Sequence, residues 1–211
     1  INKDELVEVA LNGAGTGNYM QTPPMFPGHS ERNLDEYNID LAKQWLESSG
    51  LDPATITFSC ICSDDTKRRA GEVIQASLSE VGINMELESM DLATYLSAAA
   101  EGNFEATIGG CTSVNTLGFI EYKFTSWQIG GSNFTRTNDA HLDELWTTAS
   151  QTLDETERLT ILEEAAAYLN EICPHVPMYS VNVVRAYNSN LQGFEVNASG
   201  NTYWENVSWA E

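Results

Sequence analysis

The amino-acid sequence predicts an α/β fold built around a parallel sheet, and three observations lead to this class. Segments rich in β-branched and apolar residues alternate with amphipathic helix patterns between residues 55 and 110. The helix patterns before this region and within it end at stop signals, Gly50 and Gly82. The second half of the chain adds two long helix patterns that can cover a sheet. The strand–helix–strand–helix–strand order implies parallel strands joined by right-handed crossovers.

Two helices separated by a long loop are expected in the first 50 residues. The chain opens directly in a helix pattern at Ile1, which suggests a fragment or a processed chain, and this helix ends at Asn12. Residues 13–37 are rich in Gly, Pro, Asn and Ser, so we expect an ordered loop or an arm. The second helix covers residues 38–49 and has an asparagine at its N-cap. Its apolar residues share one face: Leu41, Trp45 and Leu46.

The predicted sheet has strands at residues 55–62, 83–90 and 104–110. The connecting helices are expected at residues 64–81 and 91–101, and each begins at an aspartate that can cap it. In the usual order of a doubly wound sheet, the first of these strands lies between the other two.

The second half of the chain is predicted to be mostly helical. Helices are expected at residues 139–151 and 154–172, followed by a strand at residues 175–184. The tail beyond Asn188 is rich in turn residues but carries several large apolar side chains. We expect these side chains to pack on this domain or on a neighbouring molecule, because they are too apolar to stay in water. They are Phe194, Tyr203, Trp204, Val207 and Trp209.

Composition excludes some classes of function. The 211 residues include 31 acidic and 10 basic side chains, for a net charge of −21. Such a charge repels phosphate, so nucleic acid is excluded as a partner and an anionic membrane surface is disfavoured. No apolar run approaches the roughly 18 residues of a membrane-spanning helix. The length fits one large domain or two small ones.

Topology alone suggests a ligand site. In a doubly wound sheet, ligands bind beyond the carboxyl ends of the strands, where the strand order reverses. Here that point lies between residues 61–64 and residues 109–113. The pair Gly109-Gly110 would let a ligand approach the backbone closely, although the same glycines could simply turn the chain.

No catalytic set, metal site or cofactor site is predicted. Cys60 and Cys62 alternate on one face of a strand, which favours buried free thiols, although a disulfide from one of them to Cys111 stays possible. Cys173 lies near His175, but no activating base or orienting third group can be placed for a nucleophile. The three histidines lack the spacing of metal ligands.

A series of short motifs, in order along nearly the whole chain, resembles the family 5 solute-binding proteins of ABC importers, the dipeptide, oligopeptide and nickel group. Each motif is modest, and their shared order and spacing carry the resemblance. The motifs are Ile1-Asn2-Lys3-Asp4-Glu5-Leu6-Val7, Tyr37-Asn38 with Ala42-Lys43 and Leu46, Asp91 with Tyr95, Gly102-Asn103-Phe104, Pro174-His175-Val176-Pro177-Met178-Tyr179 and Trp204-Glu205-Asn206-Val207-Ser208.

This resemblance implies a lobe of the type II periplasmic-binding-protein fold, a mixed sheet with a β-α-β-α-β core flanked by helices. Residues 1–211 would be a single lobe, the C-terminal one, and the tail at 185–211 would return to a missing N-terminal lobe. The whole protein would close on a peptide or other small solute and deliver it to an ABC permease. It would be extracytoplasmic, in the periplasm or at the cell surface as a lipoprotein. Two alternatives stay open: a sensor or chemoreceptor-linked binding protein, and a cysteine-dependent enzyme using Cys111 or Cys173.

The resemblance places ligand contacts on the same two strand ends that topology indicates. The family's charged anchors are missing there. Ser113 stands where dipeptide and oligopeptide binders have a carboxylate for the ligand's amino terminus, and Ile61 stands where dipeptide binders have an arginine. Dipeptides are therefore expected to be poor ligands unless the missing lobe supplies both charged anchors. The predicted ligand-binding residues are Ile61, Cys62, Ser63, Gly110, Cys111, Thr112, Ser113 and Asn115.

Overall fold

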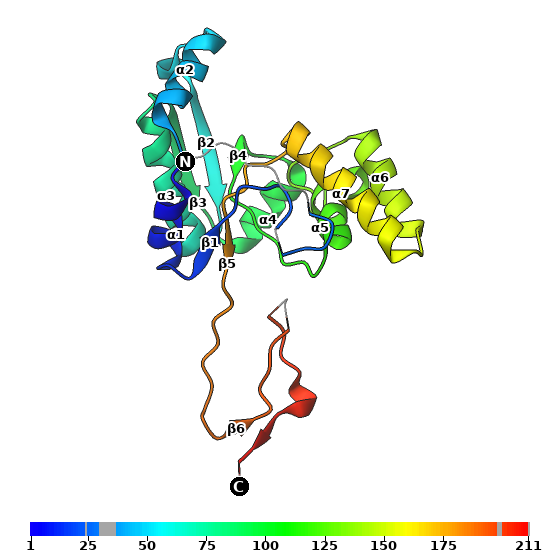
Figure 1. The fold of residues 1–211 in the computed structure, drawn as a ribbon. Coiled ribbons are helices and arrows are strands. Elements are labelled where there is room, and N and C mark those ends of the chain that lie inside the picture. Colours follow the sequence, from blue (N-terminus) through cyan, green and yellow to red (C-terminus); the bar gives the residue numbers. More distant parts are fainter. Residues whose placement is uncertain (24, 30–36, 198–199, 211) are drawn as a thin grey trace.

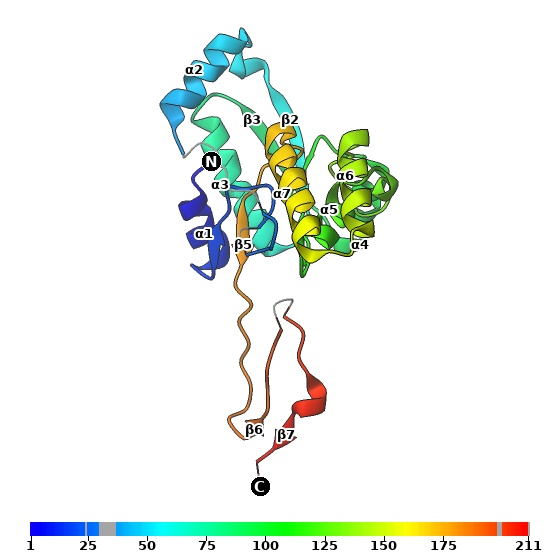
Figure 2. The same ribbon diagram turned by 45° about the vertical axis from the view of Figure 1, so that its right-hand side comes forward.

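The computed structural model describes residues 1–23, 25–29, 37–197 and 200–210. The fold has an α/β part and a helical part side by side, and an extended hairpin projects from them (Figure 1). Figure 2 shows helix α2 and this hairpin at opposite ends of the molecule. The mixed helix and sheet content confirms the predicted α/β class.

A three-stranded parallel sheet forms the centre of the α/β part. Its strands are β2 (Thr57–Cys62), β3 (Asn84–Ser89) and β4 (Ala106–Thr107), in the order β3-β2-β4. This confirms the predicted strand order. Strand β4 is shorter than expected, because the chain leaves the ladder soon after Ile108 and enters its two-glycine segment.

Helices cover both faces of this sheet. On one face, helix α3 (Asp65–Ser79) packs on the strands, and helix α1 (Lys3–Leu11) packs on α3. On the other face, helix α4 (Leu92–Glu101) contributes Tyr95 and Ala99 to a small cluster with Ile61. The larger cluster consists of Leu6, Val7, Ala10, Leu11, Cys60, Cys62, Ala70, Val73, Ile74, Met85 and Ile108.

A second, two-stranded sheet was only half predicted. Strand β5 (Tyr179–Val181) is the core of the expected strand at 175–184, and it pairs antiparallel with β1 (Gly15–Gly17) inside the expected loop. The close approach of the two strands at Gly15 leaves no room for a side chain. A Cβ atom there would lie 2.8 Å from the Ser180 carbonyl oxygen, well inside van der Waals contact.

The helical part has its own core. It contains α5 (Thr116–Phe124), α6 (Ala140–Gln151) and α7 (Glu155–Ile172), of which α6 and α7 were predicted and α5 was not. Phe26, from the loop after β1, also enters this core. The other buried members are Phe119, Ile120, Phe124, Leu142, Leu145, Ala149, Leu162, Ala165 and Leu169.

Helix α2 (Ile39–Ser49) forms where the sequence predicts it. The Asn38 side chain caps its first turn, and Gly50 ends it in the left-handed region at φ 71°. None of its residues is buried, and Trp45 is 66% exposed. Leu41 and Leu46 are half-buried, so the described part of the chain covers the shared apolar face only in part.

The C-terminal segment corrects one expectation. It forms a long hairpin, closed by strands β6 (Leu191–Gln192) and β7 (Ser208–Trp209), that extends away from the body (Figures 1 and 2). Phe194 contacts Tyr187 and Trp204 within the hairpin, while Trp204 stays 68% exposed. Packing on this lobe, the first of the two expected alternatives, is wrong, because the extended segment after β5 carries these aromatic residues away from both cores; packing on a neighbouring molecule stays a prediction.

Candidate functional site

The two strand ends selected from the sequence do lie side by side. In the β2–β4 ladder Ile61 is the partner of Thr107, and the Ile108 amide donates to the Ile61 carbonyl over 3.0 Å. The strand order therefore places the crevice position between the ends of β2 and β4, as topology predicts.

The predicted residues at the end of β2 differ in accessibility. The side chains of Ile61 and Cys62 lie in the two cores on opposite faces of the sheet, and the residues are 3% and 0% exposed. Ser63 is the first partly exposed residue after them. On this side of the site, Ser63 therefore offers the accessible side chain.

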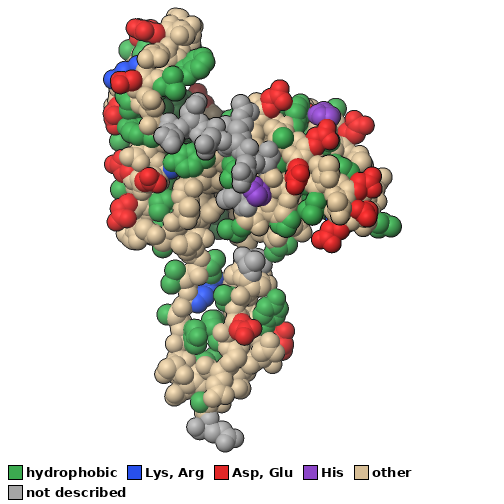
Figure 3. Space-filling view, viewed as in Figure 1, with side chains coloured by type: hydrophobic (Ala, Val, Ile, Leu, Met, Phe, Trp, Pro, Cys, Tyr) green, Lys and Arg blue, Asp and Glu red, His purple; other side chains and the backbone are tan. Residues whose placement is uncertain are grey.

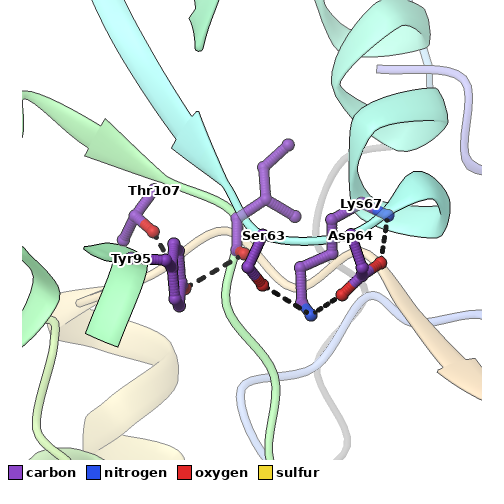
Figure 4. Close-up of polar contacts among 6 residues, drawn as sticks. Ser63, Asp64, Lys67, Tyr95 and Thr107 are labelled. Carbon is purple, nitrogen blue, oxygen red and sulfur yellow. Dashed lines mark hydrogen bonds and ion pairs between the residues drawn. The ribbon is translucent and has the colours of Figure 1, made fainter. Parts of the chain in front are cut away.

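Ser63 belongs to a small polar group at the start of α3. Lys67 donates to the Ser63 hydroxyl over 3.4 Å and forms an ion pair with Asp64 (Figure 4). The Asp64 carboxylate also caps the helix by accepting from the Lys67 amide over 2.9 Å. The positive charge of Lys67 is thus already neutralised within the fold.

Tyr95 ties helix α4 to the end of β4, and sequence reasoning gave it no such role. Its hydroxyl donates to the Ile108 carbonyl over 3.2 Å and accepts from the Thr107 hydroxyl over 3.0 Å (Figure 4). Burial raises the pKa of this phenol, so it stays protonated and able to donate. The only sequence signal was its place four residues after the Asp91 cap.

The remaining predicted residues lie on the segment that links β4 to α5. Gly110, Cys111 and Thr112 are exposed. The Ser113 hydroxyl donates to the Asn115 carbonyl over 3.1 Å, and the Asn115 side chain caps α5 by accepting from the Gly118 amide over 2.8 Å. The segment is thus anchored at its far end by a helix cap, and its first half is open to solvent.

The candidate site is an open surface. A groove of about 350 Å³ lies between α3 and β3, and another of about 330 Å³ lies between α1, α2 and residues 173–177. Neither is lined by a predicted site residue. Within the described residues, no three His, Cys, Asp or Glu side chains gather as a metal site would require.

All four cysteines are free thiols, which gives a direct chemical test of the packing. Cys60 and Cys62 are buried, whereas Cys111 and Cys173 are exposed, and burial raises the pKa of Cys60 to about 11. We expect two thiols to react with a disulfide reagent in the native protein and four in denaturant without reductant. The variant Cys111→Ser should lower the native count to one. A count below four in denaturant would contradict the free-thiol assignment.

Comparison with known proteins gives the chain its relatives. The dipeptide-binding protein of Escherichia coli K12 is 24% identical over 217 residues, which cover 99% of this chain and 41% of that relative. Among solved structures, HbpA2 from Haemophilus parasuis matches all of this chain and 43% of its own, with 26% identity and a TM-score of 0.82. A dipeptide-binding protein from Pseudoalteromonas sp. SM9913, in complex with Met-Leu, gives a TM-score of 0.85 at 18% identity, over 99% of this chain and 43% of its own.

These comparisons agree on the fold and on the extent of the match. The chain spans less than half the length of each of these three proteins. The two structures confirm the binding-protein fold that the sequence motifs imply. The sequence profile described as "Bacterial extracellular solute-binding proteins, family 5 Middle" matches residues 1–131. Because that match covers more than half of the chain, the protein belongs to the bacterial extracellular solute-binding proteins of family 5.

Proposed function

We propose that this chain is the C-terminal lobe of an extracytoplasmic solute-binding protein that captures a peptide or other small solute between two lobes. The observation that carries the proposal is the solvent-exposed edge of the sheet where β2 and β4 end next to each other. Small-molecule sites bury about 70% or more of the ligand surface, and an open edge needs a second wall to do this. Closure of two lobes supplies that wall, and the closed form would then be presented to an ABC permease.

The hairpin supports a two-lobed protein. Residues 185–211 expose Trp204 and Trp209 at 68% and 66%, more than a free surface normally tolerates side by side with other apolar groups. In Figure 1, strand β2 points toward the side from which this hairpin leaves the body. A first lobe packed around the hairpin would cover its aromatic side chains and face the candidate site.

A non-enzymatic role fits the environment of Cys173. Its thiol contacts the carbonyl of His175 over 3.6 Å and accepts from the Gln21 side-chain amide over 3.4 Å. No hydrogen bond joins the thiol to the imidazole ring within the described residues, so the ring is not placed to activate it. A sensor-linked binding protein would use the same lobe with a different membrane partner.

The cellular location is proposed from the family, whose description is extracellular. We infer an extracytoplasmic protein, either free in a periplasm or held at the cell surface by a lipid. In the described part of the chain, no helix combines the length and apolar character needed to cross a membrane.

Site blocking tests the proposal in the full-length protein. A panel of di- to pentapeptides would be titrated by calorimetry, and we expect micromolar or tighter binding of at least one peptide longer than two residues. Dipeptides should bind at least about tenfold more weakly, because Ser113 and Ile61 provide no charge. The variant Ser113→Trp, which fills the edge, should abolish binding.

The matched control is Leu153→Trp, since Leu153 lies between α6 and α7 and is 95% exposed. It should leave binding unchanged. Full affinity in Ser113→Trp would refute the site, and the absence of binding to every peptide would refute the peptide ligand.

A further inference from the structure

Lys123, at the end of α5, is a half-buried cation with no acidic partner among the described residues. The described residues provide no hydrogen bond or ion pair to its ammonium group, and all three ion pairs in that part of the chain lie in the first turns of α3. The chain has 31 acidic side chains, and Figure 3 shows many of them scattered over the α/β part and the helical part. Among the described residues, no carboxylate lies within ion-pair distance of the Lys123 ammonium group.

That place is next to the candidate site. The Lys123 ammonium lies 5.9 Å from the centre of the Phe134 ring. The same ring lies 3.6 Å from the position where a Cβ atom on Gly109 would stand, and it packs against Tyr95 at 6.2 Å between ring centres. Burial raises the pKa of the Cys111 thiol and the nearby Lys123 charge opposes that rise, so the two groups lie near each other. These contacts place the lysine close to the segment from Gly109 to Cys111, with the Phe134 ring next to both.

Lys67, on the other side of the site, differs from Lys123 because an acidic side chain neutralises its charge. It is paired with Asp64 and hydrogen-bonded to Ser63, so it has little charge to offer a ligand. Within the described part of the chain, the Lys123 ammonium faces the ring of Phe134, at the roughly 6 Å limit of a cation–π contact, and has no ion pair. An ammonium group taken partly out of water and left unpaired is costly, and a ligand carboxylate would offset that cost.

We infer that Lys123 is the anion-binding residue of this lobe and that the captured solute carries a carboxylate held near Gly109–Cys111. This inference rests on the proposed function and names its substrate class. Burial also lowers the pKa of Lys123, which agrees with a site that lacks its counter-ion when empty. The carboxylate could come from a peptide's C-terminus or from an acidic side chain.

The experiment uses the full-length protein and two libraries of tripeptides, one with free C-terminal carboxylates and one with C-terminal amides. Retained peptides are identified by mass spectrometry and then titrated by calorimetry. We expect retention of the free acids, or of those amides that contain Asp or Glu, and the difference identifies the source of the carboxylate. Lys123→Met should weaken binding about 30-fold or more, as for loss of one partner of a desolvated charge pair.

The control is Lys43→Met, because Lys43 is exposed on α2 and far from the site, and it should bind like the wild type. Thermal unfolding of both variants checks that they fold. Unchanged affinity in Lys123→Met would overturn this inference while leaving the solute-binding proposal intact.

If neither library binds, the peptide-binding proposal fails and a second measurement decides the anion site. The lysines are labelled with ¹³C-methyl groups, and sodium acetate is titrated against sodium chloride at equal ionic strength. A saturable shift of the Lys123 signal, assigned by its loss in Lys123→Met, supports a carboxylate site. No shift beyond that in chloride overturns it.

Discussion

Acidification from pH 6.5 to pH 4 is expected to destabilise the protein by roughly 3 kcal/mol through His175 alone. Burial and the nearby Lys123 charge lower the pKa of this imidazole from 6.5 to about 4. Between these two values the unfolded chain binds a proton that the folded chain does not. The free energy of unfolding is therefore highest above the unfolded pKa and falls as the pH drops toward the folded one.

The surroundings of His175 explain this shift. The ring stacks on Phe124 with 5.2 Å between ring centres, and Phe124 is fully buried in the helical core. Its Nδ1 atom is buried and has no hydrogen-bond partner within the described residues. A proton on that nitrogen would place a charge in an apolar setting, near the Lys123 ammonium and without any acceptor.

Urea unfolding of wild type and His175→Phe at several pH values measures this effect. Phenylalanine keeps the stack on Phe124 but cannot be protonated, so the variant should lose about 3 kcal/mol less stability than wild type on going from pH 6.5 to 4. Comparing the two removes the contribution of the many carboxylates. Identical pH dependence in wild type and His175→Phe would contradict the neutral, buried assignment.

The elements that the sequence predicted well carry their own local signals. Helices α2, α3 and α7 each begin at a side-chain cap, at Asn38, Asp64 and Asp154, and their bounds came within a few residues of the expected ones. The parallel sheet followed from the alternation of such helices with β-branched segments. In these regions local preference and tertiary structure agree, so a local pattern is sufficient.

The missed elements depend on partners distant in the chain. Strand β1 is only three residues of Gly-Thr-Gly and exists because β5 arrives beside it from more than 160 residues away. Helix α5 contains threonine and glycine in its first turn, which weaken the helix signal, and packing of Phe119 and Phe124 into the second core outweighs that preference. Tertiary contacts of this kind leave little trace in a short window of sequence.

The candidate site also combines a feature that the sequence predicts with features that depend on distant contacts. Topology located the adjoining ends of β2 and β4, because the position follows from strand order alone. Tyr95 and the proposed anion-binding Lys123 belong to α4 and α5, which approach the site only in three dimensions. The burial of Ile61 on one face of β2 and Cys62 on the other required knowing that helices cover both faces.

The largest effect on binding is expected from separating the lobes. Residues 1–211 alone should bind peptides at least about 1,000-fold more weakly than the full-length protein, and without measurable affinity at micromolar peptide. The edge between Ser63 and Ser113 covers one side of a ligand, so the other side stays in water. Each hydrogen bond to the ligand is then made in a high dielectric, where its net contribution is small.

Folding and binding should therefore separate in this chain. The parallel sheet and the three-helix core each bury a contiguous apolar cluster within residues 1–211, so we expect a cooperative thermal transition. Circular dichroism melting and calorimetry on the same sample measure both properties, and the full-length protein is the matched control for binding. Micromolar peptide binding by residues 1–211 would contradict the two-lobe mechanism, because a single open edge would then be sufficient to bind the peptide. If residues 1–211 fold but do not bind while the full-length protein binds, the difference in affinity is due to the second lobe and to closure of the two lobes.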